Sequence, residues 1–349
     1  MSAGPRPSLC LAGPMLGSHA GWVVSQGEIL AELFAERGHR VLLTSRARQP
    51  LLRVADILQT LVRHRCVIDL ALVMVFSGRG FALADASSWL ARRLGQPLIF
   101  CLRGGNLPAF SQTHARWVAR VMRRADLLVA PSRYLATKLP AWGPPVTVIP
   151  NVVRIARCPF RPRTQLAPRL LWMRTFHDIY CPELAIDVLA HLRQQHGDAT
   201  LTMAGQDRGR LGATRAHAKA LGLERAVRFA GFLDSEAKQN EFSMHDVFIN
   251  TNKIDNTPVS VIEAAAFGLP VVATAVGGIP YLLRDGQDAL LVPAHDAVAM
   301  AAAVARLIAE PALAARLSEA GRALARRCAW PAVAGLWDAA FARVAAMRA

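Results

Sequence analysis

Short apolar runs, separated by amphipathic stretches of helical length, recur along most of this 349-residue chain. In the first part they occupy residues 9–12, 41–44, 68–76, 97–102, 127–130 and 146–149. Runs of this kind, bounded by Gly, Pro and polar clusters, are typical of βα units whose strands form a parallel sheet. The sequence therefore predicts an α/β protein.

The alternation stops at residues 150–168, a segment rich in Pro and Arg, and then resumes. The later runs occupy residues 170–173, 201–204, 227–230, 247–250, 271–273 and 289–292. We interpret the pause as an interdomain linker and predict two doubly wound, Rossmann-like domains, residues 1–160 and 161–329. Ligands bind at the carboxyl ends of the strands in such sheets, so we expect the site in a cleft between the domains.

Residues 330–349 form a separate segment in this prediction. Trp330, Val333, Trp337, Phe341 and Val344 recur at spacings of three and four, which predicts a helix with one apolar stripe. The stripe suits a helix that packs on the second domain, and also a helix that crosses back to the first.

The charge of the chain is concentrated in its first part. Residues 1–165 carry 22 basic and 7 acidic side chains, a net charge of +15, whereas residues 166–349 carry 19 and 18, a net charge of +1. Such a field attracts nucleic acid, an acidic membrane surface or a phosphorylated small molecule. No recognisable nucleic-acid-binding module is present, so we expect no nucleic-acid partner.

The sequence lacks the motifs that are typical of several other classes of protein. The six cysteines form no CxxC pair, which indicates free thiols in a reducing compartment. Neither a GxxxxGK[ST] loop nor an HExxH pair occurs, so we expect no P-loop chemistry and no metal. No charge-free apolar run reaches the ~20 residues that span a bilayer. We expect a cytoplasmic protein and leave open a peripheral attachment to the inner face of the cytoplasmic membrane.

Residues 246–280 hold the polar positions that point most directly to chemistry. We expect a strand to end at Asn250, Thr257 to cap a helix with Pro258 at its first position, and Gly268 to end that helix. Unpaired amides and the positive end of the helix dipole can hold phosphate or sugar oxygens at such a start.

Two carboxylates flank this helix start, Asp255 before it and Glu263 inside it. Carboxylates accept hydrogen bonds from hydroxyls, so the pair suits a polyhydroxylated ligand whose phosphate lies nearer the helix end. The alternative is that Asp255 organises the loop and Glu263 lies on a solvated helix face. The spacing alone leaves both open.

The string DNTPVSVIEAAAFGLPVVATAVGGIPYLL, residues 255–283, resembles the donor-binding signature of the family-4 (group 1) glycosyltransferases, which have the GT-B fold of two Rossmann-like domains. It is similar in particular to a subgroup associated with bacterial surface polysaccharide synthesis. Strings such as ERGHRVLLTS and LLWMRTFHDIYCPELAIDVL extend the resemblance along the chain. The chain departs from the pattern at Asp255, where Glu is commoner, at Pro258, where Gly is frequent, and at Tyr281, which replaces an acid.

The resemblance implies a role for each matched position. Glu263 would bind the ribose hydroxyls, Asp255 would contact the transferred sugar, and Arg174 would neutralise the departing diphosphate. Arg174 and Asp255 are therefore the expected catalytic residues. The lysine that usually follows this arginine has no clear counterpart in FHDIYCPEL. The donor-binding residues implied for the second domain are Arg174, Asp255, Asn256, Thr257, Pro258, Val259 and Glu263.

Three residues of the first domain complete the predicted donor site. Gly17 and Gly21 lie in the glycine-rich turn GPMLGSHAG, where the backbone can approach the donor diphosphate. Each can equally serve turn geometry alone. Arg103 stands about where many relatives carry a histidine that contacts the transferred sugar.

The activity implied by the resemblance is a retaining transfer without metal or cofactor. A hexose-type sugar would move from a nucleoside-diphosphate sugar to a hydroxyl of a saccharide acceptor, free or lipid-linked, in polysaccharide or glycolipid synthesis. Two alternatives share the fold: a sugar-nucleotide 2-epimerase and a non-catalytic sugar-nucleotide-binding protein.

Residues 113–124 predict a helix with a basic face made of Arg116, Arg120, Arg123 and Arg124. Such a face can lie on anionic lipid headgroups. It can equally be the solvated side of an ordinary packed helix.

Overall fold

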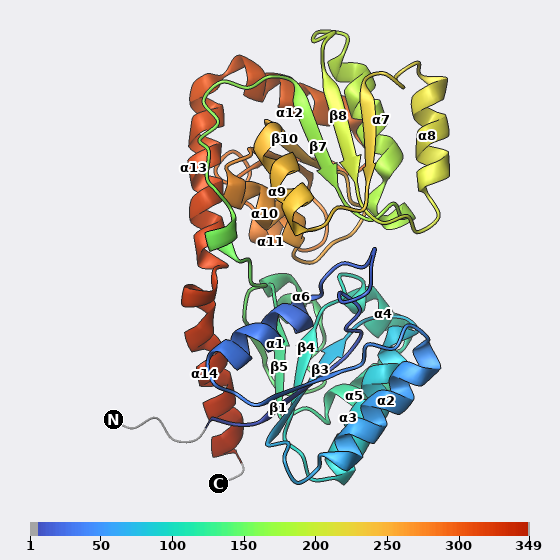
Figure 1. The fold of residues 1–349 in the computed structure, drawn as a ribbon, viewed down its shortest axis with the longest axis vertical. Helices are drawn as coiled ribbons and strands as arrows, with labels where there is room; N and C mark the ends of the chain where they lie inside the picture. The colour runs from blue at the N-terminus through green and yellow to red at the C-terminus, as the bar shows by residue number, and fades with distance from the viewer. Residues whose placement is uncertain (1–5, 348–349) are drawn as a thin grey trace. The chain divides into compact units, whose positions relative to one another are not determined.

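The structure, a computed structural model, describes residues 6–347, which separate into two compact units (Figure 1). The first unit holds the described residues up to Val152 together with those from Trp330 onward, and the second holds Val153–Ala329. Each unit contains one six-stranded sheet in which every strand pair is parallel. The predicted α/β class with two doubly wound parallel sheets is confirmed.

The sheet of the first unit has the strand order β2-β1-β3-β4-β5-β6. Its strands are β1 (Leu9–Ala12), β2 (Val41–Thr44), β3 (Leu70–Val75), β4 (Leu98–Leu102), β5 (Leu127–Ala130) and β6 (Val146–Val148). Its helices are α1 (Gln26–Glu36), α2 (Pro50–Arg63), α3 (Gly80–Arg93), α4 (Leu107–Thr113), α5 (Ala115–Met122), α6 (Arg133–Lys138) and α14 (Trp330–Ala346). The strands coincide with the predicted apolar runs to within two residues, because strands buried on both faces are apolar throughout.

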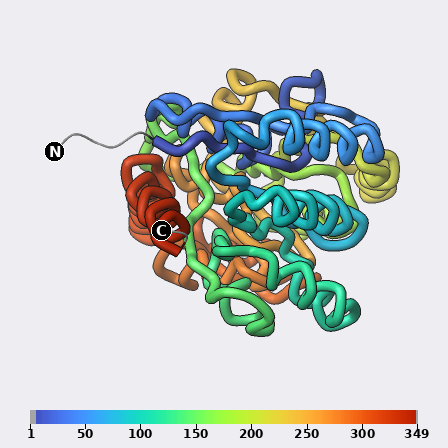
Figure 2. The backbone as a smooth tube through the Cα atoms, turned by 90° about the horizontal axis from the view of Figure 1, so that it is seen from below, coloured from blue at the N-terminus to red at the C-terminus, as the bar shows by residue number. Residues whose placement is uncertain are grey.

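The C-terminal helix α14 belongs to the first unit, where it covers the same face of the sheet as α1 (Figures 1 and 2). The ring of Phe34 in α1 lies 5.8, 5.5 and 5.3 Å from the rings of Trp330, Trp337 and Phe341. The apolar stripe left two possibilities open, and the structure confirms the one in which the helix crosses back to the first unit. The reason is that α1 alone leaves part of this sheet face uncovered, and the stripe buries it.

The sheet of the second unit has the strand order β12-β11-β10-β7-β8-β9. Its strands are β7 (Arg169–Met173), β8 (Thr200–Ala204), β9 (Val227–Gly231), β10 (Val247–Asn250), β11 (Val271–Thr274) and β12 (Leu290–Val292). Its α-helices are α7 (Pro182–Leu192), α8 (Leu211–Ala220), α9 (Ser235–Met244), α10 (Val259–Phe267), α11 (Ile279–Leu282), α12 (Ala297–Ala309) and α13 (Pro311–Arg327). Short 3-10 turns, Ile155–Arg157 and Asp178–Tyr180, precede β7 and α7.

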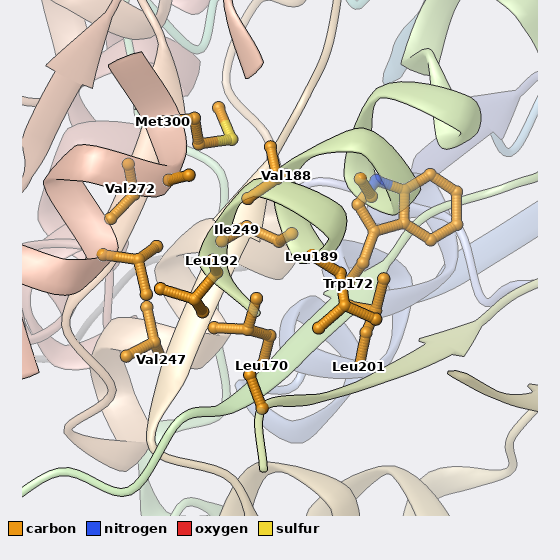
Figure 3. Packing of buried hydrophobic residues seen from close by; sticks show 14 of the residues in the cluster. Leu170, Trp172, Val188, Leu189, Leu192, Leu201, Val247, Ile249, Val272 and Met300 are labelled. Carbon is orange, nitrogen blue, oxygen red and sulfur yellow. The ribbon is translucent and has the colours of Figure 1, made fainter. Parts of the chain in front are cut away.

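Successive residues of each strand in this unit point to opposite faces. Leu170 and Trp172 of β7 pack with Ile249 of β10 against α7 and α12, as Figure 3 shows. Leu171 points the other way, into a second cluster that α9, α10 and α13 cover. The two helices that follow β7 and β10, namely α7 and α10, therefore lie on opposite faces of the sheet.

The units divide at Val152 and Val153, eight residues before the predicted boundary at 160. The residues after Val153 lack a regular period, yet they pack on the second unit. Arg163 is 1% exposed, and its guanidinium donates to the carbonyl oxygens of Phe267 and Phe242 at 2.6 and 2.8 Å. Periodicity does not reveal this segment because side chain to backbone bonds, rather than an apolar face, hold it.

No single helix among residues 6–347 is both long and apolar enough to cross a membrane. The pair α12 and α13 meets the length and hydropathy requirement only together, and it is bent by 103°.

Candidate active site

The second sheet reverses its strand order between β7 and β10. Counted within the unit, the order β9-β8-β7-β10-β11-β12 is 3-2-1-4-5-6, so the first and fourth strands are neighbours. In sheets of this kind ligands bind at the carboxyl ends of the two strands where the order reverses. Arg174 directly follows β7, and the loop with Asp255 follows β10. Topology thus brings the two expected catalytic residues, 81 positions apart in the chain, to one edge.

Arg174 is held from several sides. Its Nη2 donates to Oδ2 of Asp255 at 2.5 Å, and the guanidinium carbon lies 4.0 Å from the centre of the Tyr180 ring. The side chain is only 14% exposed. Burial disfavours its charged form, but the carboxylate of Asp255 and the side chain of Tyr180 together outweigh this effect, and the pKa of Arg174 is raised. The site therefore contains a permanently charged, well-ordered guanidinium.

The carboxylate of Asp255 accepts hydrogen bonds from three protein donors. Besides Arg174, the side-chain amide of Asn252 donates to Oδ2 at 2.6 Å, and the backbone N–H of Asn256 donates to Oδ1 at 2.7 Å. The sequence suggested either a ligand-binding role or a role in organising the loop. The contacts in this structure are those of an internal counter-ion.

Three glycines allow backbone segments to approach these residues closely. A Cβ on Gly205 would lie 1.9 Å from the carbonyl oxygen of Arg174. One on Gly277 would lie 2.2 Å from that of Asp255, and one on Gly278 would lie 2.0 Å from that of Asn256. The double glycine of the signature is therefore explained by packing, because it supports the loop that carries Asp255.

Helix α10 begins one residue later than predicted. Pro258, rather than Thr257, occupies the N-cap position, and no side chain caps the helix. The expected cap at Thr257 is thus wrong, because the restricted backbone of proline already sets the turn into the helix. The amides of Val259 and Ser260 lie in this first turn, so a ligand anion can replace a side-chain cap there.

Glu263 lies in the second turn of α10 and is not on a purely solvated face. Its side chain is 19% exposed, and its Oε1 accepts a hydrogen bond from Nζ of Lys238 in α9 at 2.6 Å. The carboxylate is half-buried and oriented, as a residue that binds hydroxyls has to be. Lys238 was not singled out from the sequence, since only the packing of α9 on α10 brings it here.

Buried polar atoms without a hydrogen-bond partner gather around the same edge. Within the part of the chain that the structure describes, they include Nε of Arg174, both amide atoms of Asn250, Oδ1 of Asn252 and Oγ of Ser260. Buried polar groups in folded proteins are nearly always paired, so such a cluster points to a site that a polar ligand or water completes. No three His, Cys, Asp or Glu side chains among residues 6–347 are placed to hold a metal ion.

A lysine from another part of the chain lies beside residues 176–184, the segment in which the sequence has no counterpart of the lysine that usually follows the arginine in this family. Lys253, from the loop after β10, donates through its backbone N–H to the carbonyl oxygen of Ile179 at 2.8 Å. Its Nζ donates to Asp178 at 3.2 Å, and this hydrogen bond lowers the pKa of Asp178. A second cation therefore accompanies Arg174 at this edge, supplied by a different loop from the one that the sequence pattern pointed to.

In the first unit, the glycine-rich turn is fixed by Glu28 of α1. The N–H of Gly17 donates to this carboxylate at 2.8 Å, and a Cβ on Gly17 would lie 2.6 Å from Cα of Val24. Gly21 has a φ of +78° and open space around it, so its backbone conformation is what requires glycine. Both glycines are explained by turn geometry, and contact with a donor stays a prediction.

Arg103 follows β4 in the first unit. Its Nη1 donates to Oδ1 of Asn151 at 2.6 Å, and burial lowers its pKa. No carboxylate pairs with it among the ion pairs of the described residues. Such a cation suits an anionic or hydroxyl-rich ligand, and its role in donor binding stays a prediction.

The predicted basic helix is broken at His114, between α4 and α5. Arg120 and Arg124 both pair with Asp85 of α3, at 3.0 and 2.6 Å. The single basic face predicted for this segment is therefore wrong, because half of its arginines point to α3. Arg116 and Arg123 remain, and with Trp142 they line a shallow pocket of about 360 Å³.

The overall fold is that of known glycosyltransferases. Sucrose-phosphate synthase from Thermosynechococcus elongatus superposes with a TM-score of 0.82 at 18% identity, covering 98% of this chain and all of that one. HepE of Anabaena, in complex with UDP-glucose, superposes with a TM-score of 0.77 at 18% identity, covering 97% and all of that chain. These likenesses define the class: this is a GT-B fold of two Rossmann-like units.

The family follows from the second unit. Residues 171–324 match the family Glycosyl transferases group 1, and this part of the chain belongs to that family. Glycogen synthase of Mycobacterium tuberculosis is 31% identical over 274 residues, 69% of this chain and 63% of that protein. The amylovoran biosynthesis glycosyltransferase AmsK of Erwinia amylovora is 31% identical over 209 residues, 56% and 51% of the two chains. The match thus spans between half and just under two thirds of these relatives' lengths.

Proposed function

We propose that this protein is a retaining glycosyltransferase that moves a hexose-type sugar from a nucleoside-diphosphate sugar to a hydroxyl of a saccharide acceptor, free or lipid-linked. The observation that carries the proposal is the buried guanidinium of Arg174 at the strand-order reversal of a group 1 glycosyltransferase domain. The uncapped start of α10 lies at the same edge of the sheet. A guanidinium and free helix amides are the donors that bind a diphosphate, so both features support the proposal.

The chemistry requires the bond between the anomeric carbon and the diphosphate oxygen to break, with its electron pair going to the diphosphate. Negative charge therefore grows on the leaving group, and a fixed guanidinium and helix amides stabilise it. Lys253 adds a cation at the same edge. In the front-face mechanism that the family resemblance implies, the acceptor hydroxyl attacks the anomeric carbon on the face from which the diphosphate leaves, and its proton passes to the departing diphosphate oxygen. Catalysis then consists mainly of orientation and charge stabilisation.

The substrates of related proteins support the same class. The structure of HepE contains UDP-glucose, and the relatives include a glycogen synthase and a phosphatidyl-myo-inositol mannosyltransferase of Mycobacterium leprae, which is 29% identical over 204 residues. The last of these names refers to the transfer of mannose, a hexose, and AmsK is named for amylovoran biosynthesis. They support a sugar nucleotide as donor and a saccharide or lipid-linked saccharide as acceptor.

The direct test is incubation of the purified protein with a panel of sugar nucleotides and polyprenyl-diphosphate-linked saccharides. Mass spectrometry should detect an acceptor that is one hexose heavier. A 2-epimerase would instead change the donor in the absence of any acceptor, and a non-catalytic binding protein would bind a sugar nucleotide without turnover of any acceptor. Either result would replace the proposed activity.

Glu263→Ala should weaken nucleoside-diphosphate binding by about tenfold or more, because hydrogen bonds to a charged group contribute about 1.5–3 kcal/mol. The measurement is titration calorimetry with the diphosphate of the donor found in the panel. Glu319→Ala is the matched control, since Glu319 is exposed on α13. Equal affinities of the wild type and Glu263→Ala would remove Glu263 from the site.

We also propose that the first unit contacts an anionic surface through Arg116 and Arg123. The support is the net charge of +15 on residues 1–165 and the position of both side chains, with Trp142, around one shallow pocket. Flotation with vesicles containing about a third phosphatidylglycerol should retain the protein at low salt and release it at high salt. The double variant Arg116→Ala, Arg123→Ala should bind less, whereas Arg120→Ala should bind like the wild type, because Asp85 already pairs with Arg120. Flotation that is equal for all three would contradict the proposal.

A further inference from the structure

The loops at the carboxyl edge of the first sheet contain arginines and no acidic residue. The loops that follow its strands are residues 13–25, 45–49, 76–79, 103–106, 131–132 and 149–152, and none of them contains Asp or Glu. Five arginines lie in or directly after these loops: Arg46, Arg48, Arg79, Arg103 and Arg133. Ligands of doubly wound sheets bind at the carboxyl edge, so this part of the positive charge lies where a ligand binds.

These five arginines have no carboxylate as a partner. Among the ion pairs within residues 6–347, none includes one of their side chains. Two acidic side chains of the adjoining helices α1 and α2 have other partners. Glu28 accepts hydrogen bonds from the N–H of Gly17 and of Ser25, and Asp56 accepts one from Oγ1 of Thr44.

Arg103 differs from the other four because it is half-buried, whereas they are exposed. Its Nε is buried and has no hydrogen-bond partner among the described residues, and its Nη1 donates to the neutral amide oxygen of Asn151. The neighbouring Cys101 supplies no negative charge at pH 7, because burial raises the pKa of its thiol to about 11. Burial lowers the pKa of Arg103 as well, but an arginine stays charged at neutral pH.

A buried charge without a counter-ion is costly, and folded proteins nearly always pair such charges. Arg103 is nevertheless held in place, since its backbone N–H donates to the carbonyl oxygen of Val75 at 2.9 Å and Asn151 binds its guanidinium. The protein thus keeps a desolvated cation at the edge of the sheet where ligands bind. An anionic ligand would supply both the missing charge and the missing hydrogen-bond acceptor.

We propose that the carboxyl edge of the first sheet binds the acceptor, and that it selects an acceptor with a negatively charged group, a carboxylate or a phosphate, which Arg103 neutralises. This inference rests on the proposed function. A transferase needs a site for its second substrate, and the proposed donor site lies in the second unit, where residues 166–349 have a net charge of only +1. The exposed arginines attract the anion to this edge, and Arg103 makes the specific contact.

Two kinds of acceptor carry such a group. An acidic saccharide has a carboxylate on a sugar ring, and a lipid-linked saccharide has phosphates between the sugar and the lipid. Both anions accept two parallel hydrogen bonds from a guanidinium, so the contact with Arg103 is of the same kind for either. The experiment therefore uses one probe for each source.

The experiment is titration calorimetry of the whole chain, without donor, with three probes. Cellobiouronic acid carries a carboxylate, geranyl diphosphate carries the phosphates of a lipid linker, and cellobiose is the neutral sugar. The proteins are the wild type, Arg103→Ala and Arg40→Ala. Arg40 is the matched control, because it is an exposed arginine that directly precedes β2, at the opposite edge of the same sheet.

We expect the wild type to bind at least one of the two anionic probes about tenfold more tightly than cellobiose, because hydrogen bonds to a charged group are the stronger ones. The probe that is preferred identifies the source of the anion. Arg103→Ala should abolish this preference, whereas Arg40→Ala should retain it. The affinity for cellobiose should be the same in all three proteins.

The inference is overturned if the wild type binds neither anionic probe more tightly than cellobiose, or if the preference persists in Arg103→Ala. In the second case, weaker binding of UDP by Arg103→Ala would assign Arg103 to the donor instead. If Arg103→Ala does not fold, as judged from its circular dichroism, Arg103→Met keeps the volume of the side chain and gives the same test. A protein that prefers the anionic probe but transfers no sugar from any donor would contradict the proposed function while the anion-binding edge remains, so the two failures are distinguishable.

Discussion

Arg174→Ala should lower kcat by about 10²–10³, the range found when one stabilising donor is removed from a developing anion. The guanidinium is a buried cation at the edge of the sheet where we propose that the diphosphate binds, and Asp255 pairs with it. KM for the donor should change less than kcat, because the charge on the leaving group is largest in the transition state. Steady-state kinetics with the donor and acceptor found in the panel provide the measurement.

Two further variants define the specificity of this effect. Arg174→Lys keeps the charge but loses the planar guanidinium that lies against Tyr180, so it should recover only part of the lost rate. Arg306→Ala removes an exposed arginine of α12 that pairs with Glu310, and it should leave kcat unchanged. A kcat for Arg174→Ala equal to that of the wild type would show that leaving-group stabilisation lies elsewhere.

Gly278→Ala should disrupt the site without touching any functional side chain. The new Cβ would lie 2.0 Å from the carbonyl oxygen of Asn256 and 2.8 Å from its carbon, and both are backbone atoms that cannot move aside alone. We expect a loss of stability of about 1–3 kcal/mol, typical of overpacking, and a shift of the loop that holds Asp255. Nucleoside-diphosphate binding should weaken by about tenfold or more, because the displaced loop carries the hydrogen-bond partner of Arg174 and leads into the start of α10.

Thermal unfolding and titration calorimetry together test this prediction. Gly212→Ala is the matched control, because Gly212 lies at the start of α8 with no atom within 4 Å of a new Cβ. That change should stabilise the protein by up to about 1 kcal/mol, since alanine is the better helix former. Equal melting temperatures and equal affinities for Gly278→Ala and the wild type would mean that the loop tolerates the displacement.

The strands and the glycosyltransferase signature could be found from the sequence because both are local. A strand buried on both faces is a continuous apolar run, whether or not its neighbours are known, and β1, β2, β5 and β10 have the predicted bounds. The segment from Asp255 to Glu263 was recognised as a loop and a helix start from consecutive residues. Only the N-cap of this helix was predicted one position too early, at Thr257, because threonine is a preferred N-cap residue and proline is more often found one position later.

The partners of these residues could not be found from the sequence, because they come from other parts of the chain. Lys238 of α9 pairs with Glu263 of α10. Asp85 of α3 pairs with Arg120 and Arg124, two of the four arginines that the sequence places on one basic helix face. The sequence also did not decide which unit α14 packs against. An apolar stripe indicates that a helix is buried, but it does not identify the surface that covers it.

The sequence by itself determined the α/β class, the two sheets, the family resemblance and the positions of Arg174, Asp255 and Glu263. The tertiary structure alone decided that Arg174 and Asp255 form one pair. The physical reason is the reversal of strand order that makes β7 and β10 neighbours, because it brings residues 81 positions apart within hydrogen-bonding distance. A carboxylate that looks free in the sequence is then occupied by a cation from a distant strand, and its chemistry changes with that contact.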